Sequence, residues 1–357
     1  MSAHAHNLAA FPLYAQNLEP HPLAKLWEQA FYDLIQEQAE QHAFSPAAKE
    51  REHEAEALFD AIARHRQCEA FLVMDTTIPW QPVPLTAVTY YAAHNGRGAG
   101  LYLEDIVTTK RERGRGAGSF ALATLAQVAL KRRFNYVAWE CAAHNTVAQD
   151  FYTSHGAMSH NDQHTWRQGQ VPNLNAQETD TDSGLAFRKI SFGNYRPLIS
   201  FLEEQGMPPH EGQRKLLSHK AYDEDPLFIV ATETTKSGHE GNVVGMASAY
   251  RSFSTFRIVS GLHISSLYAQ GNDPQIASSL LRQFTPLQHK RNLLGHTDIT
   301  LADRQKEWLN PVIEQAGFEP LAYGEDKMIV RSLHDSALHK LACRYGNRDL
   351  TTHLRCH

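Results

Sequence analysis

The chain has 357 residues, of which 42% are apolar and 20% are charged. This length suits two domains better than one, and the apolar content is enough for packed cores. The formal net charge of -5 gives no general attraction to nucleic acid. No apolar run reaches the roughly 18 residues of a membrane span, and the first residues lack the pattern of a secretory signal. We therefore expect a two-domain cytoplasmic protein that binds neither nucleic acid nor membrane.

The cysteines and histidines predict neither a disulfide framework nor a metal site. The four cysteines are few and dispersed, so we expect free thiols at Cys68, Cys141, Cys343 and Cys356. Histidine is abundant, but no His-Glu-x-x-His run occurs. The one compact Cys/His group, at residues 353–357, is typical of a frayed chain end. No metal cofactor is expected.

The chain begins with helical patterns that lead into strands. Apolar residues recur at helical spacing over residues 22–42, which predicts an amphipathic helix, and a second helix is expected over 46–66. Residues 70–75 and 85–92 have the composition of strands and are separated by a Pro-rich turn.

Residues 101–119 (LYLEDIVTTKRERGRGAGS) contain a basic, glycine-dense turn that opens a helix expected from Ser119 to Arg132. Closely spaced glycines let the backbone turn tightly and bring several N–H groups to one anion. The start of the helix adds unpaired N–H groups and the positive end of its dipole. The segment predicts a phosphate site.

Spacing separates the phosphate-binding motifs that this turn could represent. A Walker loop needs Gly-Lys-Ser/Thr, which the chain lacks, and the dinucleotide fingerprint fails because Ser119 stands where its third glycine belongs. Residues 113–118 instead spell Arg-x-x-Gly-x-Gly. Upstream, residues 87–105 look like paired strands that end in Tyr-Leu-Glu-Asp. Downstream, a strand is expected at 136–141. The short helix expected at 145–154 carries Asn-x-x-Ala-x-x-Phe-Tyr, and Gly156-Ala157 follows it.

These motifs together, at gap-free spacing over about residues 70–167, resemble the GNAT acyltransferases, and most of all the spermidine/spermine (diamine) acetyltransferases. The resemblance implies an α/β fold (the α+β GNAT fold) with a mixed sheet, acetyl-CoA as co-substrate, and N-acetyl transfer to a primary amine. It also implies the residues that bind acetyl-CoA: Ile106, Val107, Arg113, Gly114, Arg115, Gly116, Ala117, Gly118, Ser119, Asn145 and Phe151.

The same resemblance points to the catalytic groups. A carboxylate can take the proton of the amine, directly or through water, and we expect Glu104 in this role with Asp105 as the alternative. Neighbouring strand residues face opposite ways, so only one of the two faces the cleft unless the strand is bulged. Tyr152 can protonate the leaving thiolate, although its reference pKa of about 10 exceeds that of a thiol, about 8.5. Asn145 either contacts the pantetheine arm or caps a helix.

The acceptor is less well defined by the sequence. The first helix carries four acidic residues, Glu28, Asp33, Glu37 and Glu40. They could bind a polycation, although an acidic helix face exposed to solvent would explain them as well. The family's acidic turn before Tyr-Leu-Glu-Asp is replaced here by residues 94–98, and Arg97 would disfavour a long polyamine. A short diamine, an amino-acid amine and a protein lysine all remain candidates. The rival hypothesis is a non-catalytic acyl-CoA-binding sensor.

The second half of the chain repeats the order of the first. Residues 161–184 are polar and read as a linker, after which strands are expected at 185–190, 227–233, 242–251, 258–268, 297–302 and 329–331, with helices at 195–204, 274–289 and 308–316. Residues 269–275 have neither the arginine nor the spaced glycines of a phosphate loop. We predict a catalytic domain at 1–168, a linker at 169–184, a degenerate GNAT-like domain at 185–332 and a C-terminal tail at 333–357.

The presence of a second, degenerate domain in the same chain suggests how the two domains are arranged. Diamine acetyltransferases are typically homodimers with isologous interfaces, so a degenerate second domain could take the place of the partner subunit. We expect an internal pseudodimer, with a tethered independent domain as the alternative.

Overall fold

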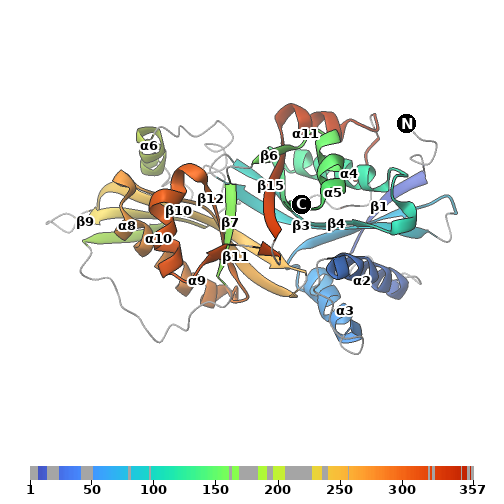
Figure 1. The fold of residues 1–357 in the computed structure, drawn as a ribbon, viewed down its shortest axis with the longest axis horizontal. Helices are drawn as coiled ribbons and strands as arrows, with labels where there is room; N and C mark the ends of the chain where they lie inside the picture. The colour runs from blue at the N-terminus through green and yellow to red at the C-terminus, as the bar shows by residue number, and fades with distance from the viewer. Residues whose placement is uncertain are drawn as a thin grey trace.

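A computed structural model of the chain contains two mixed β-sheets that lie side by side along the long axis of the molecule (Figure 1). It describes residues 7–13, 24–41, 51–78, 82–95, 98–160, 163–168, 184–190, 196–205, 227–234, 240–255, 257–320, 322–323, 326–346, 348–351 and 354. The two sheets, each with its helices, are called the first and the second unit below.

The first sheet runs in the order β1-β2-β3-β4-β5-β15-β14, with β6 paired to β15. Its neighbours are antiparallel except for β4 and β5, which are parallel. The strands are β1 (Leu8–Pro12), β2 (Glu69–Asp75), β3 (Val83–Asn95), β4 (Gly98–Thr108), β5 (Tyr136–Ala142), β6 (Met158–His160), β14 (Ala322–Tyr323) and β15 (Asp326–His334).

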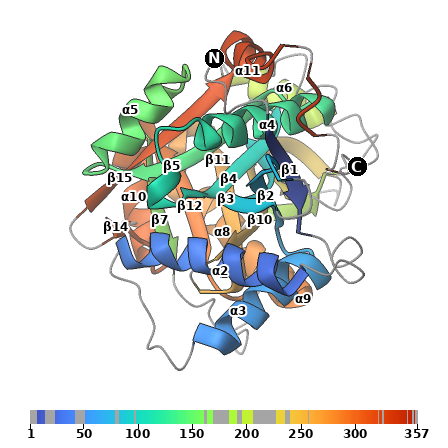
Figure 2. The ribbon, with the colours of Figure 1, turned by 90° about the vertical axis from the view of Figure 1, so that its right-hand side faces the viewer.

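Helices cover both faces of the first sheet (Figure 2). One face packs against α4 (Ala117–Lys131), α5 (Thr146–Ser154) and α11 (Asp335–Ala342). The other packs against α2 (Ala24–Gln41) and α3 (Arg51–Phe59), which a π-helical turn continues to Arg64. Helix α4 is rich in alanine and almost wholly buried, so its backbone can approach the sheet closely. This central position holds the start of α4 rigidly beside the ends of β4 and β5.

The second sheet runs in the order β13-β7-β12-β11-β10-β9-β8. Its strands are β7 (Gln163–Gln168), β8 (Leu185–Lys189), β9 (Leu227–Thr234), β10 (Glu240–Ser254), β11 (Val259–Ala269), β12 (Thr297–Ala302) and β13 (Glu319–Pro320). Its helices are α6 (Arg196–Glu204), α8 (Pro274–Arg282), α9 (Phe284–Arg291) and α10 (Asp303–Gln315). The expected helix over 274–289 is thus two helices, because Pro286 has no N–H to donate to the carbonyl of Arg282.

The two units exchange one strand each. Strand β7, which follows the first unit in the chain, pairs with β12 of the second sheet, whereas β15 pairs with β5 of the first (Figure 1). The registers correspond: Gln168 lies opposite Thr297, and Leu333 opposite Val137. The assignment of residues 329–331 to the second unit was therefore wrong, and part of the expected linker over 161–184 is a strand.

The predicted domain boundaries at 168, 184 and 332 stay a prediction. Strand β7 lies before the boundary at 168 but pairs in the second sheet, and β15 spans the boundary at 332 and pairs in the first. Part of the predicted tail is ordered structure. Helix α11 packs on α4, and its Leu338 and Leu341 are buried in the core of the first unit. Residues 353 and 355–357, with the terminal Cys/His group, lie outside the described residues.

Among the residues that the structure describes, no helix combines the length and apolar character needed to cross a membrane. The same part of the chain contains no group of three metal-binding side chains. Its cysteines are free thiols: Cys68, Cys141 and Cys343.

Candidate functional site

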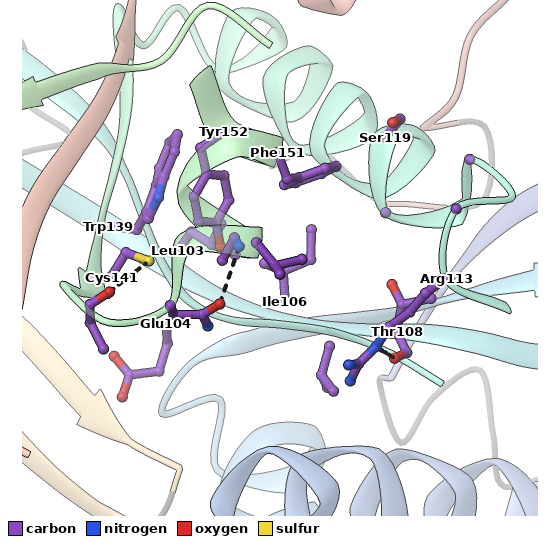
Figure 3. Close-up of a pocket in the computed structure, with 18 of the residues that line it drawn as sticks. Leu103, Glu104, Ile106, Thr108, Arg113, Ser119, Trp139, Cys141, Phe151 and Tyr152 are labelled. Atoms are coloured by element: carbon purple, nitrogen blue, oxygen red, sulfur yellow. Dashed lines mark hydrogen bonds between the residues drawn. The ribbon is translucent and has the colours of Figure 1, made fainter. Parts of the chain in front are cut away.

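A cavity of about 710 Å³ opens where β4 and β5 separate (Figure 3). The two strands pair only from Gly100–Tyr136 to Tyr102–Ala138, so their later residues diverge. The diverging strands, the turn before α4 and the start of α5 form the walls. Figure 3 shows Glu104 towards one end of the cavity and Arg113 at the other. One cavity therefore connects the predicted phosphate loop to the predicted base.

The loop has the backbone that the glycine spacing predicts. Gly114 and Gly116 have φ angles of 78° and 96°, which favour glycine, and a side chain at either position would meet open space. The first helical bond of α4 runs from the Phe120 N–H to the Gly116 carbonyl, at 2.9 Å. The N–H groups of Ala117, Gly118 and Ser119 precede that bond, as at the start of any α-helix. This arrangement suits a phosphate group.

The arginines of the loop are paired with carboxylates. The Arg113 guanidinium donates to the Thr108 carbonyl at 3.1 Å and lies 3.3 Å from a carboxylate oxygen of Glu37 on α2. Arg115 lies 3.0 Å from Glu112. Glu37, suggested by the sequence as a contact to a polycation, thus contacts the phosphate loop instead.

A β-bulge positions Glu104. On β3, Tyr90 lies opposite Leu103 and Thr89 opposite Asp105, so Glu104 is the extra residue of β4. Its side chain lines the cavity and accepts a hydrogen bond from the Tyr91 hydroxyl at 3.3 Å. Burial, and next the charge of Asp105, raise the pKa of Glu104 well above its ordinary range.

Asp105, the alternative base, does not line the cavity. Only 1% of it is exposed, and its carboxylate accepts hydrogen bonds from the hydroxyls of Thr89 and of Thr255 in the second unit, the latter at 2.8 Å. Asp105 thus joins the two units. Of these two neighbouring carboxylates, only Glu104 lines the cavity.

A second carboxylate, Glu140 on β5, also lines the cavity. It accepts a hydrogen bond from Thr165 on the exchanged strand β7. Burial raises its pKa from 4.5 to about 7, although the bond from Thr165 opposes the shift. Arg167, also on β7, forms two hydrogen bonds of 2.6 and 2.7 Å with Asp298 on β12. Through Thr165, the second sheet therefore contacts a carboxylate that lines the cavity.

Tyr152 reaches the cavity from α5 (Figure 3). Its ring packs against Trp139 and Phe151, with centroid distances of 4.7 and 5.3 Å. Burial raises its pKa above the ordinary value of 10, so the hydroxyl stays protonated at neutral pH. Asn145 caps α5 by accepting a hydrogen bond from the Ala148 N–H at 3.1 Å, and it also lines the cavity.

All the site residues named from the sequence line this cavity except Asp105 and Ala117. Sequence reasoning missed several others, namely Glu140, Trp139, Cys141, Met328, Arg344 and Tyr345. Met328 lies on the exchanged strand β15, and Arg344 and Tyr345 follow α11. No local motif marks these positions, because they reach the site through pairing with distant parts of the chain.

The second unit keeps the geometry of the first but not its chemical groups. On β10, Ser248 lies opposite Ser266 and Ala249 opposite Ile264, so Ser265 is the bulged residue that corresponds to Glu104. At the start of α8, the carboxylate of Asp273 accepts the Gln275 N–H at 2.8 Å. A carboxylate thus takes the place that a phosphate would need.

The chain is similar to one protein family and to several solved structures. Residues 26–157 match the family model described as "Acetyltransferase (GNAT) family". Among solved structures, the tandem GNAT protein from the clavulanic acid biosynthesis pathway is 13% identical with a TM-score of 0.47, and the match covers 92% of this chain and 98% of that one. A GCN5-related N-acetyltransferase from Sphaerobacter thermophilus is 17% identical with a TM-score of 0.48, covering 92% and 96%.

No curated protein matches the chain. The comparisons do not single out the diamine acetyltransferases, so that part of the resemblance stays a prediction. The first unit has the GNAT fold, and residues 26–157 match the GNAT acetyltransferase family, whose members use acetyl-CoA.

Proposed function

We propose that the protein is an acetyl-CoA-dependent N-acetyltransferase that acts on a primary amine of a small molecule. The observation that carries this proposal is the single cavity that joins the loop at Gly114 and Gly116 to Glu104 and Tyr152. Phosphate-binding backbone, a carboxylate and a protonated phenol are the groups that acetyl transfer from a CoA thioester to an amine requires.

The donor fits the residues of the cavity. Acetyl-CoA supplies the acetyl group as a thioester. The N–H groups of Ala117, Gly118 and Ser119 are oriented for the pyrophosphate, and the positive φ of Gly116 brings the backbone to it without a side chain. Beyond the paired part of β4, the backbone at Ile106 and Val107 would receive the pantetheine arm and the thioester carbonyl.

Glu104 acts as general base. An alkyl ammonium has a pKa of about 10.4, so the acceptor has to lose a proton before it can attack. Burial raises the pKa of Glu104, which brings its proton affinity closer to that of the amine. The hydroxyl of Tyr91 orients the carboxylate.

Tyr152 acts as general acid. Burial raises the pKa of this phenol, so the hydroxyl is protonated at neutral pH. Because a thiol has a lower pKa, donation of the proton to the departing sulfur requires that the site stabilise the phenolate as the thiolate develops. Trp139 and Phe151 hold the ring between them, which fixes the direction of the hydroxyl.

The acidic end of the cavity favours a cationic acceptor. Glu104 and Glu140 approach from the two diverging strands and both line the cavity. An ammonium group brought between them would be attracted by either carboxylate and would lower the raised pKa of Glu140. A short diamine or an amino-acid amine fits this chemistry, as the resemblance to diamine acetyltransferases suggests.

We also infer that the second unit takes the place of a partner subunit. The reciprocal exchange of β7 and β15 supports this arrangement, because each sheet contains a strand from the other half of the chain. Two residues of the second sheet support this inference: Thr165 donates to Glu140, and Asp298 binds Arg167 on the same strand as Thr165.

The test is release of free CoA thiol from acetyl-CoA across a panel of amines that includes short diamines, amino acids and a lysine peptide. The expected result is release above hydrolysis with one class of small primary amine. Tight binding of acetyl-CoA without release would favour the rival, an acyl-CoA-binding sensor. Release only with the peptide would favour a protein lysine acetyltransferase.

A further inference from the structure

The phosphate end of the cavity has less free positive charge than its sequence suggests. Arg113 and Arg115 each lie beside a carboxylate, that of Glu37 and that of Glu112 respectively. Each pair is close to neutral as a whole. CoA carries a pyrophosphate and a 3′-phosphate, so an additional cation at this end would strengthen its binding.

Arg344 is such a cation. It lies in the turn that follows α11, is exposed, and lines the same cavity as the phosphate loop. Among the described residues, no ion pair or hydrogen bond engages its guanidinium. Arg344 lines this cavity together with Ser119 in the first turn of α4, whose hydroxyl lies 2.9 Å from Nε2 of His155. Burial lowers the pKa of His155, and the charge of Arg344 adds a smaller contribution in the same direction.

The backbone on both sides of Arg344 is fastened to α4. The side-chain amide of Gln127 donates to the carbonyls of Ala342 and Arg348, at 2.8 and 3.0 Å. Its oxygen accepts the Leu350 N–H at 2.8 Å. Tyr345 packs edge-on against Phe120, with centroids 5.3 Å apart. These contacts keep Arg344 at the mouth of the cavity.

We propose that Arg344 binds a phosphate group of the CoA donor, so that the segment after α11 completes the donor site of the first unit. This inference rests on the proposed function. A guanidinium suits the role because its planar N–H groups can form two parallel hydrogen bonds with phosphate oxygens. The donor site is then built from two distant parts of the chain, with the loop at 113–118 on one side and Arg344 on the other.

The test compares Arg344→Gln with Arg111→Gln in the full chain. Arg111 is also exposed and lies near the loop, but it does not line the cavity. Dissociation constants for CoA, 3′-dephospho-CoA and pantetheine are measured by calorimetry, the last by competition. Arg344→Gln should weaken CoA binding by about 10- to 100-fold, as expected for a lost hydrogen bond between charged groups, and leave pantetheine binding unchanged.

The measurement with 3′-dephospho-CoA identifies which phosphate group Arg344 binds. If Arg344→Gln no longer matters for this ligand, the partner is the 3′-phosphate; if the loss persists, it is the pyrophosphate. Unchanged CoA binding, an equal loss for pantetheine, or an equal loss in Arg111→Gln would overturn the inference. Failure of the unsubstituted protein to bind CoA would instead overturn the proposed function.

Discussion

Glu104 owes its position to one extra residue in β4. The alternation of a regular strand would place Glu104 and Asp105 on opposite faces, but the bulge opposite Thr89 and Tyr90 breaks that alternation. Glu104 then contacts Tyr91 and the cavity, while Asp105 is buried against Thr89 and Thr255. The sequence favoured Glu104 over Asp105 as the base but could not show which of the two faces the cavity, because a bulge depends on the register of the neighbouring strand.

Glu104→Gln tests the base through the pH dependence of kcat/KM. A base must be ionised to accept a proton, so activity should fall as pH decreases through the raised pKa of Glu104, above the ordinary carboxyl range. Gln cannot accept the proton, so the variant should be slower by about 10²- to 10⁴-fold and should lose this acidic limb. A variant that keeps both the rate and the fall in kcat/KM at acidic pH would exclude Glu104 as the base.

Glu140→Gln tests the buried second carboxylate through stability. The pKa of Glu140 is raised from 4.5 to about 7, so the folded state holds the proton more tightly than the unfolded state does. Stability is therefore lost as pH rises from about 4.5 to 7, by roughly 1–3 kcal/mol. Gln keeps an acceptor for Thr165 without a charge, so the midpoint of thermal unfolding should fall less over this range in the variant. Identical declines in both proteins would contradict the assigned pKa.

Elements that depend on local sequence were predicted well, and those that depend on pairing were not. The start of α4 follows from the glycines at 114 and 116, whose backbone requirement is local. Strands β7 and β15 could each pair in either sheet, because the two sheets have the same strand order. The hydrophobic pattern of a strand does not show which of the two sheets it joins. Arg344 was missed for the same reason, since its place beside the cavity depends on how α11 packs on α4.

Replacement of Gly116 tests the element that holds the phosphate, and Tyr152→Phe serves as its matched contrast. Gly116→Val forces a branched side chain onto a φ of 96° and places it where the pyrophosphate would approach, so CoA affinity should fall steeply. Tyr152→Phe keeps the packing on Trp139 and removes only the hydroxyl. It should leave CoA affinity nearly intact and slow turnover by about 10²-fold. Equal losses of affinity in calorimetry would remove Tyr152 from its role as acid.

At the scale of the molecule, the exchanged strands make the two units depend on each other. The first sheet contains β15 between β5 and β14, and the core beneath it includes Leu333, Leu338 and Leu341 from the end of the chain. The second sheet contains β7 between β12 and β13. Neither unit can complete its own sheet from a continuous part of the sequence.

A fragment of residues 1–170 therefore tests the internal pseudodimer. It would lack β15 and α11, which exposes the edge of β5 and apolar surface on α4, and it would carry β7 without the strand that β7 pairs with. An exposed edge and an unpaired strand favour exchange between copies, so the fragment should self-associate or aggregate in sedimentation velocity. The full chain, whose own second unit supplies the missing strand, needs no second copy to be stable. A fragment that is monomeric, stable and as active in the thiol assay as the full chain would show that the second unit is only tethered to an independent enzyme.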